Sequence, residues 1–355
     1  MILNDRIKAF ISLGKFLMQF GESSDKADHP INQLYYDSFA QLIKTAHHSN
    51  GWFTEDNVRN AINQIALSLN ESELLEWVAI YINKLSEPSS PKTVGIVMAG
   101  NIPLVGFNDF LCVLLSGNKA LIKTSSNDHV LLPAIAEVLS SIEPRFNDQI
   151  EFAENKLPPV DALIATGSDN TARHFEYYFK KHPKIIRHNR NSVGVLTGME
   201  KEEELAELGK DIFQYFGLGC RNISKLYVPS NYNFNSFFTS IYKYKDVINN
   251  NKYGNNYEYN RTVFLMSKEN KMLDNNFLIL KEDSNINSPI GVLFFEYYED
   301  INMVNEQLSR QKQLIQCVVS SSEKIQDALP FGQAQCPSLN DYADGIDTIL
   351  FLTSL

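Results

Sequence analysis

The chain has 355 residues, of which 44% are hydrophobic and 21% charged, a composition typical of a globular protein with a large core and about two domains. Its formal net charge of −10 excludes a general nucleic-acid-binding surface, which needs clustered lysine and arginine, but leaves room for a local basic pocket for a phosphorylated cofactor. No run of about 18 apolar residues occurs and the charged N-terminus has no signal-peptide core, so we expect no membrane span and a cytoplasmic location.

The first 90 residues have the pattern of amphipathic helices. Ile7, Phe10 and Leu17 recur near the helical period of 3.6 residues. Thr54 is a predicted N-cap, and Asn70, followed three residues later by a glutamate, is typical of a capping box. We therefore predict that residues 1–90 form a helical region whose apolar faces pack on the domain that follows rather than on a membrane.

Residues 91–197 alternate between short apolar strands and helices. The strands are predicted at residues 93–99, 119–123, 161–166 and 192–196. The helices are predicted at residues 104–115, 129–141 and 170–181. Strands separated by helices of this length indicate βαβ units and a parallel sheet. Ligands bind beyond the carboxyl ends of such strands, and Asn101, Lys123 and Ser168 all lie at or just beyond a predicted strand end.

Residues 198–325 predict a second α/β domain. Its helices are predicted at residues 200–215, 235–247 and 301–310, and its strands at residues 224–228, 262–266, 277–280, 292–295 and 314–319. Residues 248–260, rich in asparagine and tyrosine, are predicted to be a loop, because their composition offers no packed face. The segment 326–355 is turn-rich and ends in a predicted strand, residues 348–352, which we expect to return to the first α/β domain or to form an oligomer interface.

One cysteine lies at the junction between a helix and a strand of this second domain. Cys220 follows Gly217 and Gly219, which permit backbone geometries that other residues avoid, and Arg221 adds a positive charge that favours a thiolate. These features suit a nucleophilic cysteine. They also suit a small apolar residue beside a glycine helix cap, and the stretch alone leaves both interpretations open.

Other motifs are absent or have ordinary explanations. The chain lacks the GxGxxG fingerprint after a strand, a Walker A sequence and a GxSxG elbow. Cys112, Cys317 and Cys336 lie in or beside apolar runs or next to proline, so we interpret them as structural; without a CxxC pair we expect no metal site. The histidines at 174, 182 and 188, near Arg187 and the arginine at 190, suit either a catalytic cluster or a solvated basic edge, and we favour the basic edge.

Five segments, in order and at characteristic spacing, carry a family resemblance. AGNIPL at residues 99–104, SGNKALIKTSSND at 116–128, ATGS at 165–168 and FGLGC at 216–220 resemble motifs of the aldehyde dehydrogenase superfamily. Together with DYADGIDT at 341–348, they are most similar to the LuxC-type acyl-CoA reductases, the fatty acid reductase component of bacterial bioluminescence. The resemblance runs from about residue 93 to the C-terminus.

The resemblance implies an aldehyde dehydrogenase-like α/β fold. Its parts would be the helical N-terminal region, a Rossmann-like nicotinamide cofactor-binding domain at residues 91–197, a catalytic domain at 198–325 and the C-terminal segment. The cofactor would be NADPH or NADH, and the substrate acyl-CoA or another acyl thioester. An acyl-transferring partner protein and a homo-oligomer are also implied.

The resemblance also assigns roles to individual residues. Cys220 would attack the acyl carbonyl and hold the acyl group as a thioester. Asn101 and the backbone N–H of Cys220 would form the oxyanion hole, which needs fixed donors. Lys123 would contact the adenosine ribose or its 2′-phosphate. The pyrophosphate would lie at Thr166, Gly167 and Ser168, at the start of a helix.

Three functions fit these expectations. The first is an NAD(P)H-dependent acyl-CoA reductase that forms a fatty aldehyde, expected to be long-chain. The second is an aldehyde-oxidising dehydrogenase, and the third is a non-catalytic subunit with the same fold. An oxidising enzyme needs a general base to hydrolyse its acyl-cysteine, yet residues 184–198 contain no carboxylate, and the glutamates from Glu200 to Glu204 are predicted to form an acidic helix start. This favours the reductase.

Overall fold

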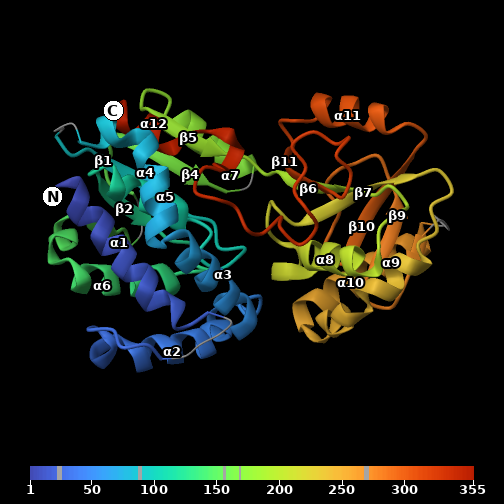
Figure 1. Ribbon diagram of the computed structural model, residues 1–355, viewed down its shortest axis with the longest axis horizontal. Coiled ribbons are helices and arrows are strands. Elements are labelled where there is room, and N and C mark those ends of the chain that lie inside the picture. The colour runs from blue at the N-terminus through green and yellow to red at the C-terminus, as the bar shows by residue number, and fades with distance from the viewer. Residues whose placement is uncertain (22–25, 87–89, 155–156, 168, 268–271) are drawn as a thin grey trace. The chain divides into compact units, whose positions relative to one another are not determined.

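The computed structural model describes residues 1–355 apart from 22–25, 87–89, 155–156, 168 and 268–271. The described chain forms two units (Figure 1). The first consists of Met1–His188 together with Ser338–Leu355, and the second of Asn189–Pro337. Each unit is built around a mainly parallel sheet, which confirms the predicted α/β class.

The first unit begins with the expected helical region, which contains four helices shown in blue tones in Figure 1. They are α1 (Leu3–Met18), α2 (Asn32–Ser49), α3 (Glu55–Ser68) and α4 (Glu71–Ser86). Both predicted caps form: the Thr54 hydroxyl accepts from the Asn57 N–H at 3.3 Å, and the Asn70 side chain accepts from the Glu73 N–H at 3.0 Å. These bonds satisfy N–H groups that a helix start leaves without intrahelical partners.

A five-stranded parallel sheet with the order β3-β2-β1-β4-β5 follows these helices. Its strands are β1 (Thr93–Val97), β2 (Lys119–Lys123), β3 (Ile150–Phe152), β4 (Ala162–Thr166) and β5 (Lys184–Arg187). The helices among them are α5 (Phe107–Leu115), α6 (Leu131–Ile142) and α7 (Asp169–Tyr178). One apolar cluster joins Phe10 of α1 and Trp77 of α4 to Ile96 of β1, so the N-terminal helices and the sheet share a core.

The last part of the C-terminal segment, Ser338–Leu355, completes the first unit and ends in a helix. Residues 348–352, predicted to be a strand, belong to α12 (Thr348–Thr353), drawn in red in Figure 1. Asp347 caps this helix by accepting from the Leu350 N–H at 2.9 Å, and also accepts from the Tyr81 hydroxyl at 2.8 Å. The strand prediction was wrong because a short apolar run reads alike in a buried strand and a buried helix.

The second unit contains a six-stranded sheet with the order β11-β6-β7-β10-β9-β8, in which only β8 is antiparallel to its neighbour. The strands are β6 (Asn191–Val195), β7 (Ile223–Pro229), β8 (Met272–Asp274), β9 (Ile279–Glu282), β10 (Val292–Tyr298) and β11 (Ile315–Ser320). The helices are α8 (Glu202–Phe213), α9 (Asn235–Ser240), α10 (Asn251–Met266) and α11 (Ile301–Arg310). The sequence-based division grouped residues 192–196 with the first domain, whereas in the structure β6 pairs with β7 and β11.

Two predictions for this unit were wrong. Helix α10 covers most of the predicted loop at residues 248–260 and all of the predicted strand at 262–266. Asn250 caps this helix and accepts from two N–H groups, at 3.0 and 3.2 Å. Tyr253 and Tyr257, one turn apart, are buried, and their hydroxyls bond to the Phe277 carbonyl and to Asp274. Tertiary partners therefore give a packed face to a sequence whose composition suggested none.

Candidate functional site

The expected helix and strand on either side of Cys220 are present, and the chain between them is sharply bent. After α8, three consecutive residues adopt the left-handed conformation: Tyr215 (φ 53°), Phe216 (φ 58°) and Gly217 (φ 77°). Each non-glycine residue in this region costs about 1 kcal/mol, so surrounding contacts must hold it there. Cys220 is exposed at the end of this bend.

The side chain of Asn222 stabilises the bend through hydrogen bonds on both sides of it in the sequence. It is only 3% exposed, and its Oδ1 accepts from the Gly219 N–H at 2.8 Å. Its Nδ2 donates to the carbonyl of Gln214 at 2.6 Å and to that of Asp211 at 3.2 Å. One amide thus joins the end of α8 to the residue that precedes Cys220.

Two buried ionisable side chains, those of Asp211 and Arg221, connect the bend to the distant segment 332–334. The Asp211 carboxylate, on α8, accepts from the N–H groups of Gly332 at 2.7 Å and Ala334 at 3.0 Å. Burial raises the pKa of Asp211 to about 7, although these two hydrogen bonds oppose the rise. Arg221 is 8% exposed and donates to the Ala334 carbonyl at 3.0 Å, so its guanidinium also anchors this segment.

Ser192 of β6 fixes the backbone of the cysteine itself. Its Oγ donates to the Cys220 carbonyl at 3.0 Å and accepts from the Cys317 N–H at 3.1 Å. The Cys317 Sγ also lies 3.1 Å from this oxygen. The Ser192 hydroxyl therefore links the backbone of Cys220 to Cys317 of β11.

The remaining cysteines are less accessible than Cys220. Cys112 is buried, and Cys317 and Cys336 have intermediate exposure. Burial raises the pKa of the Cys112 thiol well above its ordinary value, with a further contribution from Asp109, so this side chain is a neutral thiol in the core of the first unit.

The predicted cofactor-contacting residues gather at one edge of the first sheet. Lys123 ends β2 and Thr166 ends β4, and both strands flank β1, which leads to Asn101. The Lys123 amine donates to the Glu154 carbonyl at 2.9 Å. Gly167 follows β4 directly, and Ser168 lies outside the described residues. The first unit therefore carries Asn101, Lys123, Thr166 and Gly167 at the carboxyl ends of neighbouring strands, whereas Cys220 belongs to the second unit.

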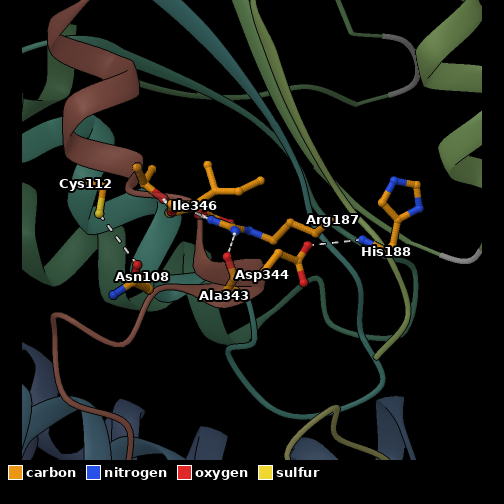
Figure 2. Close-up of polar contacts among 9 residues, drawn as sticks. Asn108, Cys112, Arg187, His188, Ala343, Asp344 and Ile346 are labelled. Carbon is orange, nitrogen blue, oxygen red and sulfur yellow. Dashed lines mark hydrogen bonds and ion pairs between the residues drawn. The ribbon is translucent and has the colours of Figure 1, made fainter. Parts of the chain in front are cut away.

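The interpretation of Arg187 as part of a solvated basic edge was wrong. Arg187 ends β5, and its guanidinium is buried in an ion pair with Asp109 of α5, with an Nη2–Oδ1 distance of 2.5 Å. Figure 2 shows it donating also to the Ala343 carbonyl, at 2.7 Å, while the His188 N–H donates to Asp344 at 3.3 Å. The His188 ring is about half exposed, and its Nε2 lies 4.0 Å from Glu176.

Several residues that shape these features were missed by the sequence analysis. Asn50, Asp128 and Asp211 are buried and bond to backbone groups far away in the chain, so no local pattern identified them. Among the described residues there is no group of three or more His, Cys, Asp or Glu side chains arranged to hold a metal ion. A search of the described helices for one long and apolar enough to cross a membrane finds none.

Comparison with known proteins supports the fold first. Aldehyde dehydrogenase 21 of Physcomitrella patens aligns with a TM-score of 0.67 at 11% identity, covering 100% of this chain and 84% of that one. The indole-3-acetaldehyde dehydrogenase AldA of P. syringae, in complex with NAD+, aligns with a TM-score of 0.66 at 12% identity, covering 94% and 75%. These likenesses confirm the expected aldehyde dehydrogenase-like fold.

Sequence comparison gives the family. A long-chain acyl-protein thioester reductase of Aliivibrio fischeri is 24% identical over 155 residues, which are 39% of this chain and 32% of that protein. The match thus spans about a third of the relative's length. The model of the LuxC acyl-CoA reductase family matches residues 33–234, more than half of the chain, and this protein therefore belongs to that family.

Proposed function

We propose that this protein is an NAD(P)H-dependent acyl thioester reductase that forms a fatty aldehyde through an acyl-cysteine at Cys220. The carrier of the acyl group would be CoA or a partner protein, since the curated relative acts, by its name, on long-chain acyl-protein thioesters. The observation that carries the proposal is the exposed Cys220 on a strained bend that Ser192, Asp211 and Asn222 brace through hydrogen bonds.

The chemistry required of the protein is acyl transfer to sulfur. The Cys220 thiolate would add to the thioester carbonyl, and the carbonyl oxygen would take the negative charge. Asn101 and the backbone N–H of Cys220 would donate hydrogen bonds to this oxygen. The bond to the leaving thiolate then breaks, and that thiolate takes up a proton, which leaves the acyl group on Cys220.

The residues at the edge of the first sheet fit a nicotinamide dinucleotide. Lys123 supplies a charged donor suited to a ribose or a 2′-phosphate, and Thr166 and Gly167 link a strand end to the start of α7, where a pyrophosphate is stabilised by the N-terminal backbone. The reduced nicotinamide, when bound, supplies the hydride that converts the acyl thioester to an aldehyde and releases Cys220. NADPH and NADH both fit these donors.

The contacts of the glutamates at the start of α8 favour reduction of the acyl-cysteine over its hydrolysis. Glu200 accepts from the N–H and hydroxyl of Thr197 and from the N–H of Gly198, and Glu204 accepts from the Lys201 N–H at 2.9 Å. Both carboxylates therefore cap the turn before α8. With residues 184–198 free of carboxylates, water attacking an acyl-cysteine would lack a nearby general base.

The test is labelling with radioactive palmitoyl-CoA in the absence of a reductant. We expect one labelled peptide, the one that contains Cys220, and no label in Cys220→Ala. Cys336→Ala, which removes a less exposed thiol of the same unit, is the matched control and should label normally. Label on Cys112, Cys317 or Cys336 in the wild type would overturn the assignment.

The decay of this acyl-enzyme separates the reductase from the alternative, an aldehyde-oxidising dehydrogenase. The labelled protein should persist in buffer, lose its label to added CoA, and release fatty aldehyde on addition of NADPH or NADH. Rapid loss of label in buffer alone as free fatty acid would instead favour the dehydrogenase. A homo-oligomer and an acyl-transferring partner remain predictions from the family resemblance.

A further inference from the structure

The turn that carries Asn101 is held at both ends by side chains from other parts of the first unit. It follows β1 and comprises residues 100–104. Its last residue, Leu104, is buried and has a left-handed conformation with φ 58°, which is unfavourable for leucine. A turn with such strain persists only when contacts with its surroundings determine its shape, and two such contacts hold this turn.

The first contact comes from the N-terminal helical region. Asn50, at the end of α2, is 5% exposed, and its Oδ1 accepts from the Trp52 N–H at 3.2 Å. That bond sets the orientation of the amide, so its Nδ2 donates to the carbonyl of Gly100 at 3.2 Å. This carbonyl shares a planar peptide unit with the N–H of Asn101. Fixing the oxygen therefore fixes the plane from which the Asn101 side chain projects.

The second contact comes from the connection between β2 and α6. Asp128 is 7% exposed, and its Oδ2 accepts from the Leu104 N–H at 3.0 Å. Gly100 also packs closely on this connection, because a Cβ at that position would lie 2.7 Å from the Ser125 Oγ and 3.0 Å from the Asp128 nitrogen. No residue larger than glycine fits there without a shift.

We propose that Asn50 and Asp128 are positioning residues for catalysis, which hold the Asn101 amide in the geometry that stabilises the oxyanion. The inference rests on the proposed role of Asn101. It also gives a function to the helical N-terminal region, which delivers Asn50 from α2 to the start of this turn. Donors aimed at a developing charge are effective because they are fixed in advance, and a displacement of about 1 Å is enough to cost roughly 10²-fold in rate.

The test is the single-turnover rate of acylation of Cys220 by radioactive palmitoyl-CoA in the full-length protein. Asn50→Ala and Asp128→Ala should each slow acylation by about 10- to 100-fold, with little change in the affinity for palmitoyl-CoA. Asp128→Asn, which keeps an acceptor for the Leu104 N–H, should recover most of the rate. A purely structural role would not produce this pattern.

The opposite end of β1 offers matched controls. Asn118 is 4% exposed and accepts from the Lys92 N–H at 3.0 Å, and Asp161 accepts from the Thr93 N–H at 2.7 Å. Asn118→Ala and Asp161→Ala remove bonds of the same kind at the amino end of the strand. They should lower the melting temperature but leave acylation within about twofold of the wild-type rate.

A double-mutant cycle decides whether the effect passes through Asn101. In the Asn101→Ala background, adding Asn50→Ala should change the rate by no more than about twofold, because there is no amide left to position. Two results would overturn this inference and leave the proposed function intact. One is a wild-type acylation rate in both Asn50→Ala and Asp128→Ala, and the other is an equally large effect of Asn50→Ala in the Asn101→Ala background. A wild-type rate in Asn101→Ala itself would refute the proposed oxyanion role and the inference with it.

Discussion

Replacing Asp211 with asparagine should remove a pH dependence from the stability of the second unit. The carboxyl group ordinarily titrates with a pKa of 3.8, but burial raises its pKa in the folded protein to about 7. As the pH rises from about 4 to about 7, the unfolded chain releases this proton while the folded chain retains it. The stability that the protonated side chain contributes is therefore full below pH 4 and is lost by about pH 7.

The magnitude follows from the shift. Each pKa unit corresponds to about 1.4 kcal/mol, so a rise of about three units makes the contribution of Asp211 fall by roughly 4 kcal/mol across this range. Asparagine does not titrate. The difference in opening free energy between the wild type and Asp211→Asn should thus decrease by about that amount from pH 4 to pH 7.5, whatever the constant effect of the altered hydrogen bonds.

Hydrogen–deuterium exchange of β7 and β10 peptides, corrected for intrinsic exchange, measures this opening free energy. Both tryptophans of the chain, Trp52 and Trp77, belong to the first unit. Their fluorescence during urea unfolding is therefore an internal control that the substitution should leave unchanged. Glu203→Gln, which removes an exposed carboxyl about two turns earlier on α8, should leave the exchange profile unchanged. Parallel pH profiles for the wild type and Asp211→Asn would refute the reasoning.

Three further predictions concern the candidate site. Asn101→Ala should lower kcat by about 10²- to 10³-fold in steady-state assays and change substrate binding much less; an unchanged kcat would reduce Asn101 to a turn residue. Lys123→Ala should raise the KM for the reduced cofactor, most strongly for NADPH if a 2′-phosphate is contacted. If the variant and the wild type have the same kinetics with both NADPH and NADH, Lys123 does not belong to the site. Asn222→Ala should destabilise the second unit by about 2–3 kcal/mol, because it leaves buried backbone groups without partners, and should slow alkylation of Cys220; normal stability by exchange would contradict the bracing role.

Where neighbouring residues determine the local structure, the sequence alone was enough to predict the helices and strands. The first four helices follow from their apolar period and from caps at Thr54 and Asn70, which act within three residues. Strands β1, β2 and β4 of the first sheet follow from short apolar runs separated by helices, whereas β3 and β5 were not predicted. The placement of Asn101 and Lys123 at the carboxyl edge needs only those strands, because parallel strands all end at the same edge.

Where the composition of a segment was ambiguous, only its tertiary partners determined its secondary structure. The asparagine- and tyrosine-rich α10 is helical because Tyr253 and Tyr257 are buried and their hydroxyls find acceptors on residues 277 and 274. The apolar run 348–352 became α12, packed on α4 and α5, rather than a strand. The family match likewise begins at residue 33, inside a helical region in which the sequence showed no motif.

The supports of the candidate site were beyond the reach of local reasoning. The sequence identified Cys220, its glycines and the Asn101 turn, because these residues are adjacent in the chain. The tertiary structure added Asn50, Asp128 and Asp211, whose backbone partners lie 50, 24 and 121 residues away. Such bonds depend on which segments the fold brings together, so they left no periodicity or spacing by which the sequence could indicate them.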